Sequence, residues 1–172
     1  LPLRKADSNK GDYGRALIVS GSTGMTGSGC LCAMAALRSG AGLVYAAVPK
    51  SLAGIYGACV TEPIILPLED GGTGVLVKEC SEQVLASIVK MDVAAIGPGL
   101  TSSAAIRQVV EQVIENSSTP LIIDADALNA ISGNASVLNK LKANGVITPH
   151  PGEMARLTGL SIDEIQRDRI GA

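Results

Sequence analysis

Aromatic residues are almost absent from this sequence: its 172 residues include three tyrosines and neither phenylalanine nor tryptophan. Apolar residues still make up 47% of the chain, so the core has to be built from small aliphatic side chains, with glycine where backbones meet. A chain of this length forms one domain and buries a substantial core. The composition favours an α/β fold in which helices cover a buried parallel sheet.

An excess of charge of one sign is also lacking. The 14 basic and 16 acidic residues give a formal charge of −2, and the basic residues neither form a block nor alternate with aromatic ones. A nucleic-acid partner therefore has little support. No apolar run reaches the length that spans a membrane, and no signal sequence opens the chain. We expect a cytoplasmic protein with neither nucleic-acid nor membrane partners.

Metal-binding patterns are missing as well. The cysteines form no CxxC pair, and a single histidine is present to complete a ligand set, which excludes the common zinc sites. We expect no bound metal among these residues and small buried thiols in a reducing compartment. The cysteines are Cys30, Cys32, Cys59 and Cys80.

Short apolar runs alternate with helical patterns along the chain, which predicts a doubly wound, mostly parallel sheet with helices on both faces. The expected strands are 16–21, 43–48, 93–99, 121–124 and 145–148, with a short edge strand within 60–70. The expected helices are 30–39, 81–91, 102–116, 126–132, 136–144, 151–159 and 161–169. We assign residues 1–172 to a single domain. Because nothing in 161–172 closes the sheet, we expect the sheet to continue beyond Ala172.

Polar, glycine-rich or proline-rich loops follow four of the expected strands. Their sequences are GSTGMTGSG (21–29), IGPGL (96–100), DADALN (124–129) and TPHPGE (148–153). The carboxyl ends of parallel strands lie at one edge of a sheet, so we expect these loops to enclose a common cleft.

The glycines of the first loop allow backbone N–H groups to face an anion, and the helix that follows adds its dipole. The loop is not a dinucleotide fingerprint, because Cys32 stands where the third glycine is required, and it lacks the Gly-Lys-Ser/Thr of a P-loop. A tight strand-to-helix turn without a ligand remains an alternative.

The last two loops carry the remaining candidate side chains. Asp126 can cap the following helix, or Asp126 and Asn129 together can bind ribose hydroxyls or a hydrated cation. His150 lies between Pro149 and Pro151, which stiffen the backbone around it. This suits a ligand-binding imidazole, although a surface proline turn with an incidental histidine is equally compatible with the pattern.

Taken together, KGDYGRALIVSGSTGMTGS, AALRSGAGLV, IGPGL, DADALN and TPHPGEMARL resemble the ADP/ATP-dependent NAD(P)H-hydrate dehydratase family of the ribokinase-like superfamily. The resemblance extends from about Asn9 to Ala172. That family repairs NAD(P)HX, the hydrated form of NADH and NADPH. The resemblance implies a ribokinase-like fold, ADP or ATP with Mg²⁺ as cofactors, and a homo-oligomer, commonly a tetramer.

The resemblance also implies roles for individual residues. The substrate-binding positions are Gly27, Ser28, Gly29, Gly99, Asp126, Asn129 and His150. The sequence departs from the family at Ser28 and Gly29, where alanine is common. Lys10, Gly11 and Gly14 match a KGDYG-like start that is structural or adjacent to the substrate. No catalytic residue is assigned, because the GSGD-like motif with the catalytic aspartate is expected downstream of Ala172, so this chain alone is expected to be inactive.

The implied reaction transfers a phosphoryl group from the nucleotide to the ring hydroxyl, and loss of phosphate then restores the double bond. His150 is expected to orient the substrate by hydrogen bonding. Two other functions fit the same cleft. One is a ribokinase-like kinase of a small, vitamin-like alcohol, and the other is a module that binds nicotinamide dinucleotides without catalysis.

Overall fold

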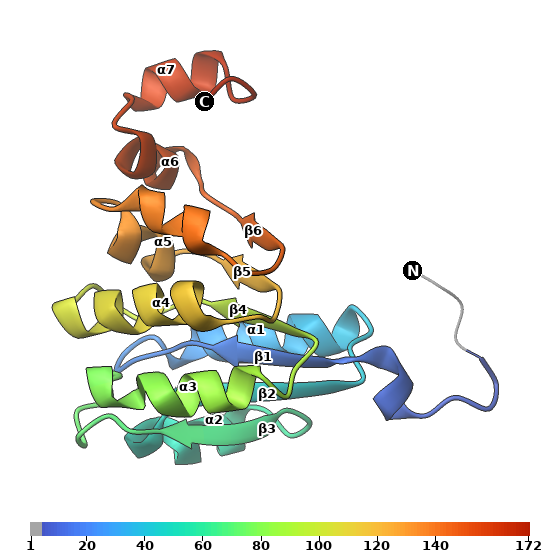
Figure 1. Cartoon of the computed structure of the whole chain (residues 1–172). Helices are drawn as coiled ribbons and strands as arrows, with labels where there is room; N and C mark the ends of the chain where they lie inside the picture. Colours follow the sequence, from blue (N-terminus) through green and yellow to red (C-terminus); the bar gives the residue numbers. More distant parts are fainter. Residues whose placement is uncertain (1–4) are drawn as a thin grey trace.

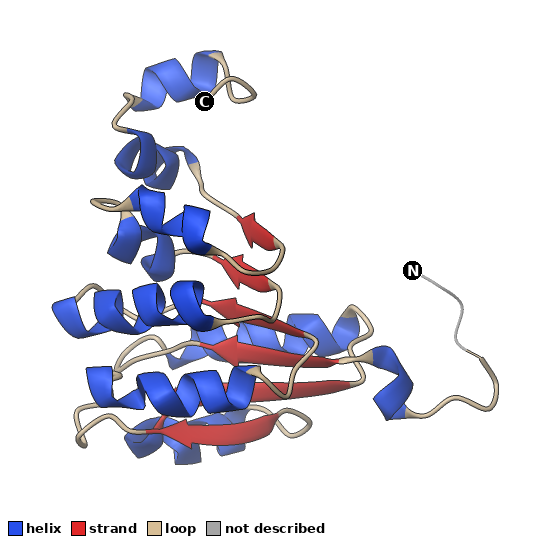
Figure 2. Cartoon of the chain, viewed as in Figure 1, coloured by secondary structure: helices blue, strands red, loops and turns tan. Residues whose placement is uncertain are grey.

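A computed structural model describes residues 5–172, which are built around a parallel sheet of six strands (Figures 1 and 2). The strands are β1 (Arg15–Val19), β2 (Leu43–Pro49), β3 (Ile64–Leu68), β4 (Val93–Ile96), β5 (Leu121–Ile123) and β6 (Gly145–Ile147). Every neighbouring pair is parallel. The expected sheet is confirmed, including the proline-containing strand β3 at one edge.

The spatial order of the strands is β3-β2-β1-β4-β5-β6. The chain therefore winds outward from β1 to one edge, returns to the other side of β1 and continues to the opposite edge. This reversal makes a switch point between β1 and β4. In open parallel sheets the crevice outside the carboxyl ends at such a point is the usual place for a ligand.

Helices cover both faces of the sheet (Figure 1). One face carries α1 (Thr26–Arg38) and α2 (Ala53–Cys59), and the other carries α3 (Ser81–Ile88), α4 (Ala104–Asn116) and α5 (Asp126–Ile131). Helices α6 (Pro151–Thr158) and α7 (Ile162–Arg167) follow β6. The short 3-10 helices are η1 (Lys10–Tyr13), η2 (Lys50–Leu52), η3 (Lys78–Cys80) and η4 (Ala135–Lys140). No helix between residues 5 and 172 has the length and apolarity needed to cross a membrane.

Side chains of each central strand enter two separate cores. In β1, Leu17 and Val19 pack with the α3–α5 side, whereas Ala16 and Ile18 pack with the α1–α2 side. Burial on both faces explains why this strand is apolar without alternation. Helix α4 contributes an apolar stripe to the first core, and each fully buried aliphatic side chain of this kind stabilises the fold by about 1.5–3 kcal/mol. The stripe consists of Ile106, Val109, Val110, Val113 and Ile114.

Three local expectations need correction. The helix expected at 30–39 begins earlier, at Thr26. The N–H groups in the first turn of a helix have no intrahelical acceptors, so glycines are tolerated there. The segment expected as a helix at 136–144 is the 3-10 helix η4, where Ser, Val and Asn favour a helix only weakly. The expectation of buried thiols holds for Cys80 but not for the exposed Cys59.

Candidate functional site at the carboxyl edge of the sheet

The loops after β1 and β4 are bound to each other at the switch point. The Gly21 N–H donates to the Pro98 carbonyl over 2.9 Å, and the Ser28 hydroxyl lies 2.7 Å from the Met25 carbonyl and 3.2 Å from that of Pro98. A Cβ atom on Gly99 would lie 2.2 Å from Ser28 Oγ. The structure thus brings together two loops that the sequence placed at the same edge, and Gly99 is the residue that permits their close contact.

The glycines at the start of α1 face different surroundings. Gly27 is exposed, with no atom within 4 Å of a Cβ placed on it, so a ligand can approach the first turn of α1 there. Gly29 is buried, and its Cβ would lie 2.4 Å from Ser20 Oγ and 2.6 Å from Tyr56 Oη. Burial raises the pKa of Tyr56 to about 12, so the hydroxyl stays neutral. Gly29 is therefore needed for packing, as the simple-turn alternative proposed.

Asp126 joins the loops after β4 and β5. Its Oδ2 accepts from the Thr101 N–H over 2.9 Å and its Oδ1 accepts from Asn129 Nδ2 over 3.3 Å. The N-cap of α5 is Ala125 and has no side-chain cap, so the capping alternative for Asp126 is wrong. In residues 5–172, Thr101 (φ 67°) and Ala125 (φ 50°) are the non-glycine residues with positive φ. Such strain costs about 1–3 kcal/mol per residue and is characteristic of functional sites.

The amide of Asn129 extends this network to α6. Its Oδ1 accepts from Arg156 Nε over 2.8 Å, and Arg156 is exposed. The sequence analysis did not single out Arg156. The signal was available, because Arg156 follows Gly152 by four residues, a spacing that places both on one face of the helix that begins at the TPHPGE loop.

His150 is the N-cap of α6. Its Nδ1 accepts from the N–H groups of Gly152 (3.0 Å) and Glu153 (3.4 Å), while Glu153 accepts the His150 N–H (2.9 Å). The other ring nitrogen, Nε2, lies 3.3 Å from Glu153 Oε1. Both ring nitrogens thus face the first turn of α6. The pattern is a capping box with histidine in place of serine or threonine, which the sequence analysis missed.

A hydrogen bond also joins the loops that follow β5 and β6. The hydroxyl of Thr148, after β6, donates to Asp124 Oδ1, after β5, over 2.7 Å. Together with the contacts at Gly99 and Asp126, this bond connects all four loops along one edge. The four loops therefore meet at one edge of the sheet, as expected, and the cleft that they would enclose stays a prediction.

A further loop, after β3, also reaches this edge. The Gly74 carbonyl accepts the N–H of Thr23 over 2.9 Å. The loop is organised by Asp70, whose buried carboxylate accepts from the Ser51 hydroxyl and from backbone N–H groups that include those of Gly72 and Gly74. Burial alone would raise the pKa of Asp70, but these donors outweigh it and hold the pKa below its ordinary value. Residues 71–74 were not among the candidate loops expected from the sequence.

The KGDYG segment lies at the other end of the strands, before β1 begins. Its Gly14 carbonyl accepts the Gly42 N–H over 3.1 Å, and a Cβ on Gly42 would lie 1.7 Å from the Lys10 carbonyl oxygen. Lys10, Gly11 and Gly14 thus have a structural role, and of the two alternatives offered for them the substrate-adjacent one is not supported.

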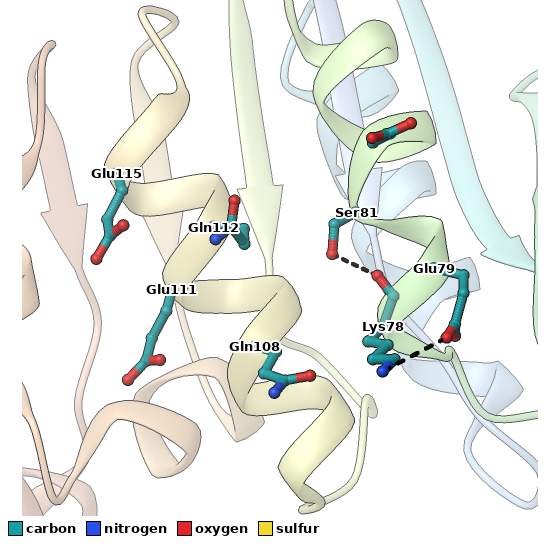
Figure 3. A pocket seen from close by; sticks show the side chains of 8 residues that line it. Lys78, Glu79, Ser81, Gln108, Glu111, Gln112 and Glu115 are labelled. Carbon is teal, nitrogen blue, oxygen red and sulfur yellow. Dashed lines mark hydrogen bonds and ion pairs between the residues drawn. The ribbon is translucent and has the colours of Figure 1, made fainter.

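A hollow with a volume of about 640 Å³ lies elsewhere, on the outer surface between α3 and α4 (Figure 3). Its carboxylates include Glu111, which lies 3.8 Å from Arg107 Nε, and Glu115, which pairs with Lys140. The lining is rich in acidic groups and does not suit a ligand that carries phosphate. It consists of Lys78, Glu79, Ser81, Glu82, Gln108, Glu111, Gln112 and Glu115.

The described residues do not form a magnesium site at the sheet edge. Across residues 5–172 no group of three or more His, Cys, Asp or Glu side chains is arranged to hold a metal ion. The two candidate carboxylates, Asp124 and Asp126, already accept hydrogen bonds from the protein. No metal is therefore assigned to these residues.

A family model described as NAD(P)H-hydrate dehydratase matches residues 16–172. The chain belongs to this family. It is 44% identical over 170 residues to the bifunctional NAD(P)H-hydrate repair enzyme Nnr of Moorella thermoacetica, covering 99% of this chain and 32% of that relative. The Nnr enzyme of Escherichia coli is 37% identical over 99% of this chain and 30% of the relative.

Solved structures agree with the family assignment. The ADP/ATP-dependent NAD(P)H-hydrate dehydratase of Bacillus subtilis, co-crystallized with ATP/Mg²⁺, superposes with a TM-score of 0.79 at 29% identity and covers 99% of this chain and 56% of that one. A ribokinase-like superfamily protein of Enterococcus faecalis has a TM-score of 0.78 at 27% identity, with 94% of this chain and 54% of that chain covered. The fold of this chain is thus ribokinase-like, as expected. The chain spans about a third of the length of the curated relatives.

Proposed function

We propose that residues 1–172 form the N-terminal portion of a single ribokinase-like α/β domain and supply the binding surface for NAD(P)HX. The full gene product would return NAD(P)HX to NAD(P)H in a nucleotide-dependent reaction. The observation that carries this proposal is the contact between the first turn of α1 and Gly99 at the switch point, in a chain of the NAD(P)H-hydrate dehydratase family.

The geometry gives this surface two kinds of group. Gly27 exposes the first turn of α1, where backbone N–H groups and the helix dipole favour an anion such as a dinucleotide phosphate. Asp126, Asn129 and His150 lie along the same edge on polar loops, where they fix the loop shapes. These positions, with Ser28, Gly29 and Gly99, form our proposed substrate-binding edge.

The proposed chemistry begins with transfer of a phosphoryl group from ADP or ATP to the hydroxyl on the hydrated ring. Loss of phosphate then regenerates the double bond. The Bacillus subtilis dehydratase was co-crystallized with ATP/Mg²⁺, and we propose the same cofactors for the full gene product. Among residues 5–172 no group of His, Cys, Asp or Glu side chains is arranged to hold a metal ion, and we propose that these residues contribute binding and orientation.

The test is a product analysis of the full gene product with (S)-NADHX or (S)-NADPHX and ATP or ADP. We expect inorganic phosphate and the reduced cofactor in equal amounts. A stable phosphate ester of the substrate would contradict dehydration and favour the small-alcohol kinase. Binding of the hydrate without loss of nucleotide would instead favour the non-catalytic module.

We also propose that the protein acts in the cytoplasm as a homo-oligomer, since its substrate would be a damaged cytoplasmic coenzyme. On the face of the sheet opposite α3–α5, Ile122 and Val146 are register partners across β5 and β6 and are exposed to 36% and 56%. This apolar area supports contact with further protein surface. Light scattering after size-exclusion chromatography gives the mass of the particle, and a monomer mass would contradict the assembly.

A further inference from the structure

Three of the edge loops are joined by one chain of hydrogen bonds that ends at an arginine. Asp126 accepts from the Thr101 N–H and from Asn129 Nδ2, and Asn129 Oδ1 accepts from Arg156 Nε. Both oxygens of Asp126 and both polar atoms of the Asn129 amide are therefore engaged within the protein. The terminal guanidinium nitrogens of Arg156 are the groups of this network that remain directed to solvent.

We propose that Arg156 binds a phosphate group of the dinucleotide substrate, and that Asp126 and Asn129 are positioning residues that aim it. This inference rests on the proposed function. It deepens that function because it assigns substrate contact to Arg156, which lies in the TPHPGEMARL stretch but for which the resemblance implied no role. It also changes the roles of Asp126 and Asn129 from direct ligands to supports of Arg156.

The charge of Arg156 is not compensated by its surroundings. Within residues 5–172, no carboxylate oxygen lies close enough to the Arg156 guanidinium, 4.0 Å or less, to form an ion pair. The acceptor of its Nε–H is the neutral amide of Asn129. Arg107 offers a contrast on the neighbouring helix. It also donates Nε–H to α5, at the Ala130 carbonyl over 2.9 Å, but its charge lies 3.8 Å from Glu111.

Arg156 is exposed and lies beside His150 at the start of α6. A Cβ placed on Gly152 would lie 3.0 Å from His150 Cε1 and 3.8 Å from Arg156 Nη1. The imidazole and the guanidinium therefore both lie close to Gly152, whose lack of a side chain allows the ring to pack there.

The composition of the edge strengthens the assignment. Arg156, in the second turn of α6, is the single lysine or arginine within the segments 20–29, 97–103, 124–129 and 148–156, and Lys50 follows β2 at the same edge of the sheet. A nicotinamide dinucleotide carries a diphosphate, and its 2′-phosphorylated form carries a further phosphate. The planar guanidinium matches phosphate oxygens in a bidentate manner. With Nε fixed by Asn129, the two Nη groups of Arg156 are preorganised for that contact.

The experiment compares KM and kcat of the full gene product for (S)-NADHX and (S)-NADPHX in the wild type, Arg156→Gln, Arg156→Lys and Arg107→Gln. We expect Arg156→Gln to raise KM roughly tenfold to a hundredfold with a much smaller change in kcat. Arg156→Lys should recover part of the loss because it keeps the charge, and Arg107→Gln should match the wild type. An unchanged KM in Arg156→Gln would overturn the proposal.

The two substrates identify the phosphate that is bound. A similar rise in KM for both points to the diphosphate, and a rise confined to (S)-NADPHX points to the 2′-phosphate. Failure of the wild type to act on either hydrate would refute the proposed function itself. An active wild type with an equally active Arg156→Gln variant would refute the present inference alone.

The positioning role is tested by a double-mutant cycle. Asn129→Ala should raise the substrate KM, because the guanidinium of Arg156 loses the acceptor that holds it in place. The double variant Asn129→Ala/Arg156→Gln should have the same KM as Arg156→Gln alone, because the amide acts through the arginine. Independent, multiplicative effects would overturn the positioning role. Raised salt should weaken substrate binding in the wild type more than in Arg156→Gln.

Discussion

Replacement of Gly99 by alanine is the most informative perturbation of the loop contact at the switch point. Gly99 has φ 70°, a conformation that costs an alanine about 1–2 kcal/mol. Its new Cβ would also lie 2.2 Å from Ser28 Oγ and 3.0 Å from the Met25 carbonyl. Overpacking of this kind costs about 1–3 kcal/mol, so we expect a total destabilisation of about 2–5 kcal/mol.

Gly72 provides a matched control for the backbone part of this cost. It has φ 77° and no atom within 4 Å of a Cβ placed on it, so Gly72→Ala should lose only about 1–2 kcal/mol. Urea unfolding at a constant m-value measures both free energies. Ser28→Gly should recover part of the Gly99→Ala loss by removing the clashing hydroxyl. Equal costs for Gly99→Ala and Gly72→Ala would refute the packing of the two loops.

Three other residues give further predictions. Asp70→Asn should lower the unfolding free energy at pH 7 by about 1–3 kcal/mol. Because the pKa of Asp70 is held below 3.8 in the folded state, this contribution is complete above that value and is lost as the pH falls through the folded pKa, so the difference between variant and wild type should shrink in acid unfolding curves. A constant difference would contradict this. Asp126→Ala should destabilise the protein by about 1–3 kcal/mol in urea unfolding by leaving the Thr101 N–H without its acceptor, and Thr101→Gly should recover part of the loss because glycine adopts positive φ freely; no recovery would argue against strain at Thr101. His150→Ala should lower the free energy of unfolding by about 1 kcal/mol through loss of the helix cap, and His150→Asn should retain it because asparagine is a good N-cap residue. Both variants should raise the substrate KM far more than they alter nucleotide affinity. A normal KM in His150→Asn would leave the imidazole with a capping role alone.

The fold could be predicted from the sequence because its signals are local and redundant. The apolar run around Leu17 and Val19 is buried on both sides, and the stripe of α4 has a clear helical period. Strands separated by helices leave few topologies other than a parallel sheet. Element ends were less accurate, as the early start of α1 shows, because the first turn of a helix tolerates glycines that the apolar pattern does not place in it.

The site could be predicted only in part. Placement of the loops followed from topology, but the roles of their side chains depended on partners far apart in the sequence. Asp126 looked like a helix cap because the acceptor role it has for Thr101 is not encoded nearby. The bonds of Arg156 to Asn129 and of Asp70 to Ser51 also join separate elements, although the spacing of Arg156 from Gly152 and of Asp70 from Gly72 and Gly74 was visible in the sequence.

Amide hydrogen exchange of the full gene product, with and without (S)-NADPHX, tests the central claim directly, because it locates the bound ligand on the chain. The account predicts slower exchange in 24–29, 97–101 and 150–156, with no change in the helices that line the acidic hollow of Figure 3. Protection confined to that hollow, or none along the carboxyl edge of the sheet, would contradict the account.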